Sequence, residues 1–230
     1  HGIHGLTYIE NTCMSDTISS QITRLLVYFI LFTASSMAFS LDEDITLLVY
    51  GDSLSAAYGI EEEQGWVTLL SQKLEDERLS VIVVNGSVSG ETTTGGLVRL
   101  PAMLENYSPD LVILELGGND GLRGLPLELL KQNLEEMIDL STESGAEVLL
   151  TGIQIPPNYG PRYTLPFFRL YAELANKKVI PLVPFLIDRI PQQPELMQSD
   201  GIHPKAEAQF MILENVWPEL EPMLEDLLRN

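Results

Sequence analysis

The stretch Ile45-Thr46-Leu47-Leu48-Val49-Tyr50-Gly51-Asp52-Ser53-Leu54-Ser55 is a mostly apolar run that stops at a glycine and continues with polar residues. An apolar run without alternation is typical of a strand that is buried on both faces of a parallel sheet. Similar runs follow at residues 81–84, 111–116 and 147–151, and the first two of these lead directly into Asn-Gly and Gly-Gly. The sequence therefore predicts parallel strands that end at polar turns.

Segments with helical spacing of apolar residues separate these runs. We expect helices over 66–74, 93–104, 127–140, 165–176 and 206–228, the last one interrupted at Pro218. A fifth strand is predicted over 179–183, and its Pro181 suggests an edge position, because proline cannot donate to the ladder. A Pro- and Tyr-rich loop is expected over 155–163. This alternation predicts an α/β three-layer sandwich, with a five-stranded, mostly parallel sheet and helices on both faces.

The segment before this domain has the layout of a secretory signal peptide. An uncharged apolar run at 25–32 follows Arg24, and the small-residue stretch 33–40 comes next. The run is shorter than the about 20 residues of a membrane-spanning helix, so we expect cleavage near Ser40, a periplasmic or secreted protein, and no stable membrane insertion of the mature chain. An uncleaved anchor is the alternative. Met14 looks like the natural start, so residues 1–40 are interpreted as an upstream remnant plus signal peptide, and residues 41–230 as a single domain.

Composition excludes several classes of function. The chain carries 33 acidic and 13 basic residues, a net charge of −20, which disfavours nucleic acid as a partner. The only cysteine, Cys13, precedes the domain, so neither disulfide nor thiolate chemistry is expected there. His203 is the only histidine after His4, which makes a catalytic zinc site improbable. We expect no metal, no cofactor, and a monomer.

A serine hydroxyl becomes a good nucleophile when a base accepts its proton, and histidine is the usual base. A carboxylate on the second ring nitrogen orients such a histidine. His203 stands in Asp200-Gly201-Ile202-His203-Pro204, and Pro204 favours a turn because it disfavours helix at the residue before it. Ser53 alone could be a helix cap and His203 alone a surface histidine. Together they predict Ser53 as nucleophile, His203 as base and Asp200 as the orienting carboxylate.

These blocks resemble those of the GDSL, or SGNH, hydrolase family. The four matching blocks hold Ser53 in 51–55, Gly90 in 85–92, Asn119 in 117–120 and His203 in 200–204. The resemblance implies that the backbone N–H groups of Ser53 and Gly90 and the amide of Asn119 form the oxyanion hole. Residues 114–124 and 157–160 are similar to a bacterial periplasmic thioesterase/lysophospholipase/arylesterase group. That similarity implies hydrolysis of small-molecule acyl esters and thioesters through an acyl-enzyme intermediate.

Several assignments stay open at this point. Asp52, which is adjacent to Ser53, is interpreted as structural, and Asp120 as a turn or network residue rather than a base. The carbohydrate O-deacetylases of the same family are one alternative function, and a non-catalytic acyl-binding module is another. A metallohydrolase is a distant third, because the chain lacks ligand spacing. Apolar residues after the strand ends predict either an acyl groove or ordinary loop packing; these are Leu122, Leu125, Ile155, Pro156 and Tyr159.

Overall fold

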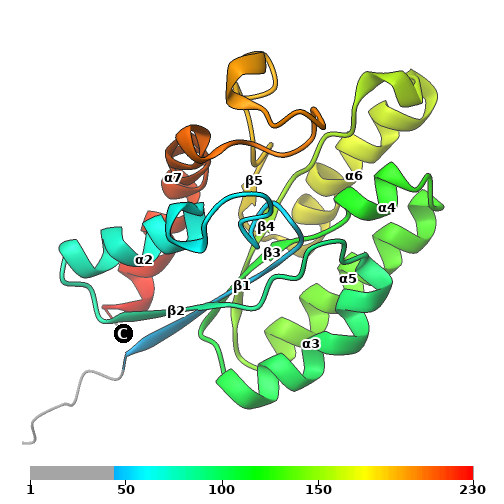
Figure 1. Cartoon of the computed structure of the whole chain (residues 1–230). Coiled ribbons are helices and arrows are strands. Elements are labelled where there is room, and N and C mark those ends of the chain that lie inside the picture. The colour runs from blue at the N-terminus through cyan, green and yellow to red at the C-terminus, as the bar shows by residue number, and fades with distance from the viewer. Residues whose placement is uncertain (1–43, 230) are drawn as a thin grey trace, which may run out of the picture. The chain divides into compact units, whose positions relative to one another are not determined.

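Five strands form one sheet, and every pair of neighbours in it is parallel. The computed structural model describes residues 44–229, so the predicted upstream remnant and signal peptide, with the cleavage site near Ser40, lie outside the described residues. The strand order is β2-β1-β3-β4-β5, as Figure 1 shows. The strands are β1 (Ile45–Gly51), β2 (Val81–Asn85), β3 (Leu111–Glu115), β4 (Glu147–Thr151) and β5 (Leu182–Val183).

Helices cover both faces of this sheet (Figure 1). One face packs against α2 (Trp66–Asp76) and α7 (Gln209–Leu227). The other packs against α3 (Thr93–Tyr107), α5 (Leu127–Glu143) and α6 (Pro161–Lys178). Short helical segments are α4 (Gly118–Leu122), η1 (Glu62–Gln64), η2 (Pro157–Tyr159), η3 (Pro194–Leu196) and η4 (Ala206–Ala208). The predicted three-layer α/β sandwich is confirmed, with the sheet wholly parallel.

Strand β1 shows why its sequence is apolar without alternation. Leu47 and Val49 belong to the core cluster on the α2–α7 side, whereas Leu48 and Tyr50 belong to the cluster on the α3–α5–α6 side. All four side chains are fully buried. Successive residues of a strand point to opposite faces, so a central strand with helices on both sides needs apolar residues at every position.

Three predicted elements need correction. The last helix is not interrupted at Pro218: α7 runs through both Pro218 and Pro222. Both prolines lie on its exposed side, so water can satisfy the carbonyl groups that lose their N–H partners. Helix α6 begins at Pro161, earlier than predicted, because proline fits the first turn of a helix.

The predicted fifth strand is also shorter than expected. Val179 adopts a left-handed conformation (φ 55°) and caps α6, and its N–H donates to the carbonyl of Ala175. Only Leu182 and Val183 pair with β4, at the edge of the sheet as predicted.

The strand order places a switch point between β1 and β3. From β1 the chain first extends the sheet through β2 on one side, and then returns to continue through β3, β4 and β5 on the other. Loops after the carboxyl ends of such strands diverge and leave a crevice, where ligands bind in open α/β sheets. Ser53 follows β1 and Asn119 follows β3, so both lie at this crevice. Among the described residues no helix is long and apolar enough to span a membrane.

Candidate active site

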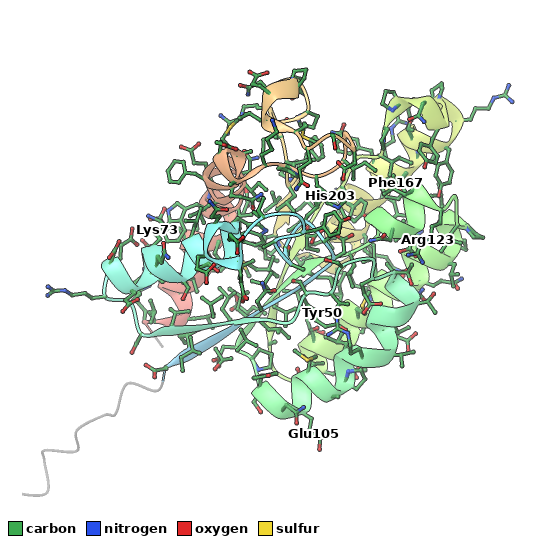
Figure 2. The ribbon with its side chains drawn as sticks, viewed as in Figure 1. Tyr50, Lys73, Glu105, Arg123, Phe167 and His203 are labelled. Carbon is green, nitrogen blue, oxygen red and sulfur yellow. The ribbon has the colours of Figure 1, made fainter. Side chains whose placement is uncertain are left out.

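Ser53, His203 and Asp200 lie in one hydrogen-bonded row. The Oγ atom of Ser53 is 2.8 Å from Nε2 of His203, although 150 positions separate the two residues. Nδ1 of the same ring is 2.7 Å from Oδ2 of Asp200. With the ring proton on Nδ1, that nitrogen donates to Asp200 and Nε2 accepts from the serine hydroxyl. Figure 2 shows His203 between the loop before α7 and the loop after β1.

A tight turn aims the histidine. Oδ1 of Asp200 accepts hydrogen bonds from the N–H groups of Ile202 (2.9 Å) and His203 (3.1 Å). Gly201, which lies between Asp200 and Ile202, has φ +68°, a left-handed conformation that glycine adopts without strain. One oxygen of Asp200 therefore builds the turn while the other contacts the imidazole.

These contacts also set the charge of Asp200. Partial burial acts to raise its pKa, but hydrogen bonds from the His203 ring and from the N–H groups of Ile202 and His203 lower it to about 2. Asp200 is therefore ionised at neutral pH, which stabilises the imidazolium that forms when His203 accepts a proton.

Gln198, which the sequence analysis did not single out, joins the loop of His203 to the loop of Ser53. Its Nε2 donates to the carbonyl oxygens of Tyr58 (2.8 Å) and Pro204 (3.1 Å). The Tyr58 ring lies against the His203 ring, with 4.5 Å between the centroids. Gly59 lies beside this amide with φ +76°, and a Cβ there would lie 2.3 Å from Oε1 of Gln198, so the amide would have to move. No local pattern marks these residues, since their partners are remote in sequence.

The two backbone N–H groups that the sequence predicts for the oxyanion hole are unpaired among residues 44–229. Within the described residues, the N–H groups of Ser53 and Gly90 donate no hydrogen bond. Gly90 has φ +80°, and its carbonyl accepts a hydrogen bond from Nη2 of Arg123 (2.9 Å). The Nδ2 atom of Asn119 donates to Oδ2 of Asp52 at 3.1 Å.

A cavity of about 330 Å³ opens beside Ser53 and Asn119. Of the predicted acyl-groove residues, Leu122, Ile155 and Pro156 line it, whereas Leu125 and Tyr159 do not. The hydroxyl of Tyr159 instead donates to the carbonyl of Leu122 (2.7 Å) and so supports the wall. The carbonyl of Leu125 accepts from Tyr163 (2.8 Å), which is loop packing.

The opposite wall of this cavity was not predicted from the sequence. It comes from the long connection between β5 and α7, with the apolar residues Phe185, Leu186, Ile187, Pro191, Met197 and Ile202. Apart from Asp200-Gly201-Ile202-His203-Pro204, this connection has no motif in the sequence, and only the return of the chain over the sheet makes its apolar residues part of the site.

Three carboxyl groups are buried at the same edge of the sheet. Asp120 accepts hydrogen bonds from the N–H (2.8 Å) and Oγ1 (2.6 Å) of Thr93, which agrees with its interpretation as a network residue. Asp52 accepts from the N–H of Leu54 and from Asn119, and it makes no hydrogen bond to His203. Glu115, the third, accepts from the N–H of Asp52 (3.1 Å) and the hydroxyl of Ser55 (2.8 Å).

Burial changes the pKa of two of these groups. Burial is the main cause that raises the pKa of Asp52 to about 6, and it raises the pKa of Glu115 well above its usual range, where the nearby Asp52 adds to the effect. Glu115 was missed, although a lone charged residue in the run Leu-Val-Ile-Leu-Glu-Leu was a usable signal. Among residues 44–229 no group of three or more His, Cys, Asp or Glu side chains could hold a metal ion.

Comparison with known proteins agrees with this geometry. Residues 49–209 match the GDSL-like Lipase/Acylhydrolase family. The chain is 53% identical to Esterase TesA of Pseudomonas aeruginosa over 179 residues, which cover 78% of this chain and 89% of the relative. It is 41% identical to Thioesterase 1/protease 1/lysophospholipase L1 of Escherichia coli, which covers 78% of this chain and 85% of the relative.

A solved structure supports the same conclusion. The psychrotrophic esterase EstA from Pseudoalteromonas sp., inhibited by monoethylphosphonate, superimposes with a TM-score of 0.76 at 41% identity. The match covers 79% of this chain and 100% of that structure. With matching fold, sequence and site geometry, this chain belongs to the GDSL-like lipase/acylhydrolase family.

Proposed function

We propose that this protein is a serine hydrolase that cleaves acyl esters and thioesters through an acyl-enzyme intermediate. One observation carries the proposal: Ser53 Oγ lies 2.8 Å from His203 Nε2 at the edge of an apolar cavity. That distance is within the range for proton transfer, and the cavity leaves room for an acyl chain beside the nucleophile.

The residues divide the reaction into two steps. His203 takes the proton from Ser53 as Oγ forms a bond to the acyl carbon, and Asp200 stabilises the resulting imidazolium. The bond from the acyl carbon to the leaving oxygen or sulfur then breaks, and His203 returns the proton to that atom. In the second step water gives a proton to His203 as its oxygen forms a bond to the acyl carbon. The bond from the acyl carbon to Oγ of Ser53 then breaks, and His203 returns the proton to Oγ, which releases the acid and the free serine.

The oxyanion that forms in each step needs donors already in place. The free N–H groups of Ser53 and Gly90 and the side-chain amide of Asn119 are our candidates. Removal of one such donor typically lowers turnover about 10²–10³-fold.

Substitution of the nucleophile is the direct test. We expect Ser53→Ala to lower kcat/KM for a p-nitrophenyl ester by at least about 10³-fold, because Ser53 carries the only hydroxyl that pairs with His203 in the described part of the chain. Ser71→Ala, an exposed serine on α2, is the matched control and should retain wild-type turnover. An organophosphonate should add its mass to the wild type and not to Ser53→Ala. Full turnover in Ser53→Ala would refute the proposal.

A substrate series tests the acyl specificity. Rates with p-nitrophenyl esters from C2 to C16, a long-chain acyl-CoA and an acetylated xylan should favour acyl chains longer than acetate, since the cavity walls are mainly apolar. Preference for the acetylated sugar would instead identify a carbohydrate O-deacetylase.

A further inference from the structure

Asp52 directly precedes the nucleophile, yet it contacts neither His203 nor a cation within the described residues. Its side chain is 2% exposed. One carboxylate oxygen accepts from the N–H of Leu54 (3.1 Å), and the other accepts from Nδ2 of Asn119 (3.1 Å). Burial of a carboxylate destabilises the folded protein, and these two hydrogen bonds offset only part of that cost. A buried aspartate at this position therefore indicates a role in the site.

The contact with Asn119 fixes the direction of an amide. An asparagine side chain has an acceptor end and a donor end, and only the NH₂ end can donate to a carboxylate. Once one Nδ2 hydrogen points to Asp52, the second hydrogen on the same nitrogen is left for another acceptor. Asn119 and Ser53 line the same cavity, so that second hydrogen is available to a substrate oxygen there.

The backbone of Asp52 is fixed by a hydrogen bond to Glu115 of β3. Its backbone N–H donates to Oε2 of Glu115, which also accepts from Ser55. Two glycines leave room for the carboxylates: a Cβ on Gly51 would come within 2.5 Å of Glu115 Oε2, and a Cβ on Gly118 within 3.0 Å of Asp52 Oδ2. Hydrogen bonds therefore run from β3 through the turn after β1 to α4, with little freedom to shift.

We propose that Asp52 is a positioning residue that acts through Asn119, because its carboxylate holds the side-chain amide with an N–H directed at the oxyanion. The inference rests on the proposed hydrolase function. It assigns Asp52 no proton transfer and no contact with substrate.

A double-mutant cycle tests this role. In Asp52→Asn two amides face each other, so Asn119 can turn its carbonyl towards the cavity. We expect kcat to fall about 10²-fold or more while KM changes far less, because the interaction is needed mainly in the transition state. Asn119→Ala should show a similar loss, and the double variant should lose little beyond either single variant, since both remove the same interaction.

The control is Asp110→Asn at the opposite edge of the sheet. Oδ2 of Asp110 accepts from the N–H of Thr46 (2.8 Å), so it too is an aspartate that anchors β1, and its loss should leave kcat unchanged. Multiplicative losses in the cycle, or an Asp52→Asn variant with full kcat, would overturn the inference. Ser53→Ala is measured alongside to separate the two proposals. If Ser53→Ala loses turnover while Asp52→Asn keeps full kcat, only the positioning role of Asp52 fails. If Ser53→Ala keeps its turnover, the hydrolase proposal itself fails.

An NMR measurement on the wild type covers the case in which Asp52→Asn does not fold. The Nδ2 resonances of Asn119 are assigned by their absence in Asn119→Ala. We expect one of the two hydrogens to be shifted downfield, relative to those of the exposed Asn176, because it is bonded to a carboxylate. Resonances like those of Asn176 would contradict the inference.

Discussion

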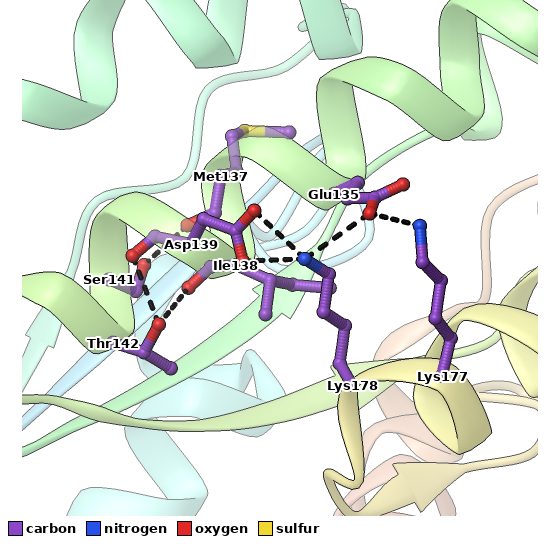
Figure 3. Close-up of polar contacts among 8 residues, drawn as sticks. All are labelled: Glu135, Met137, Ile138, Asp139, Ser141, Thr142, Lys177 and Lys178. Carbon is purple, nitrogen blue, oxygen red and sulfur yellow. Dashed lines mark hydrogen bonds and ion pairs between the residues drawn. The ribbon is translucent and has the colours of Figure 1, made fainter.

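The pKa values of carboxyl groups shift in opposite directions in two regions of the molecule. One region is the carboxyl end of the sheet below Ser53, and the other is the side of α5 that faces α6. Below Ser53, Asp52 and Glu115 are buried and pair with no Lys, Arg or His side chain among residues 44–229, and burial is the main cause that raises the pKa of both. On α5, Glu135 and Asp139 face two lysines of α6, as Figure 3 shows.

The α5–α6 contacts form a small ion-pair cluster. Nζ of Lys178 lies 2.6 Å from Asp139 Oδ1 and 3.2 Å from Glu135 Oε1, and Lys177 pairs with Glu135 as well. Hydrogen bonds from Lys177 and Lys178 lower the pKa of Glu135. Hydrogen bonds to Asp139 are the main cause that raises the pKa of Lys178.

The difference shows that the net charge of the chain, −20, does not predict whether an individual carboxyl group is ionised. Desolvation favours the neutral acid, whereas a nearby cation favours the charged form. Glu115 is fully buried beside another carboxylate, so its neutral form is favoured, and it serves as a hydrogen-bond acceptor rather than as an ion-pair partner.

The largest effect on stability is expected for Glu115→Ala. The substitution removes the acceptor for the Asp52 N–H and the Ser55 hydroxyl and leaves a cavity, which together should lower the free energy of unfolding by about 2–4 kcal/mol. Urea unfolding at pH 7 measures this. Glu135→Ala on α5 is the comparison variant and should stay near the wild type. Equal effects in the two variants would remove the distinction between the two regions.

Glu115→Gln separates the charge of the group from its hydrogen bonds. A raised pKa means that folded Glu115 keeps its proton at pH values where the unfolded chain has lost it. The folded state then binds more protons, so wild-type stability falls as pH rises above about 4.3, by up to about 1.4 kcal/mol per pH unit. Below that pH the contribution is complete.

Glutamine has no proton to lose, so its variant should lose less stability between pH 5 and pH 8. Asp52, with a pKa of about 6, adds its own decline between about pH 4 and 6 in both proteins. Urea unfolding at half-unit pH intervals measures the two slopes. Parallel curves would mean that Glu115 is ionised in the folded protein.

Lys178→Gln is expected to have the smallest effect. Loss of its ion pairs should lower the melting temperature by no more than about 3 °C in low salt, because such pairs near the surface are weak. The difference should shrink further in 0.5 M NaCl (a ~0.4 nm Debye length), where charges are screened. Lys131→Gln, also on α5, is the control, since the described residues give Lys131 no ion-pair partner. A salt-independent loss would show that the packing of the Lys178 side chain matters more than its charge.

Local sequence predicted most of the framework. The runs of β1 to β4 and the helices between them are recognisable because each is continuous in sequence and apolar where helices cover it. The predicted element boundaries were wrong where a residue type can occur in two kinds of structure. Prolines lie inside α7 on its exposed side, and Val179 caps α6 instead of entering a strand.

The sequence by itself determined which chemical groups were available: a serine, Ser53, in a strand-end turn, one histidine in the domain, and an aspartate three residues before it. Only the tertiary structure decided which groups meet, because burial and long-range hydrogen bonds depend on chain segments that are far apart in sequence. The contact of Ser53 with His203 spans 150 positions, that of Asp52 with Asn119 spans 67, and the second wall of the cavity comes from the connection before α7. A parallel sheet brings such segments together, since the carboxyl ends of all its strands lie at one edge.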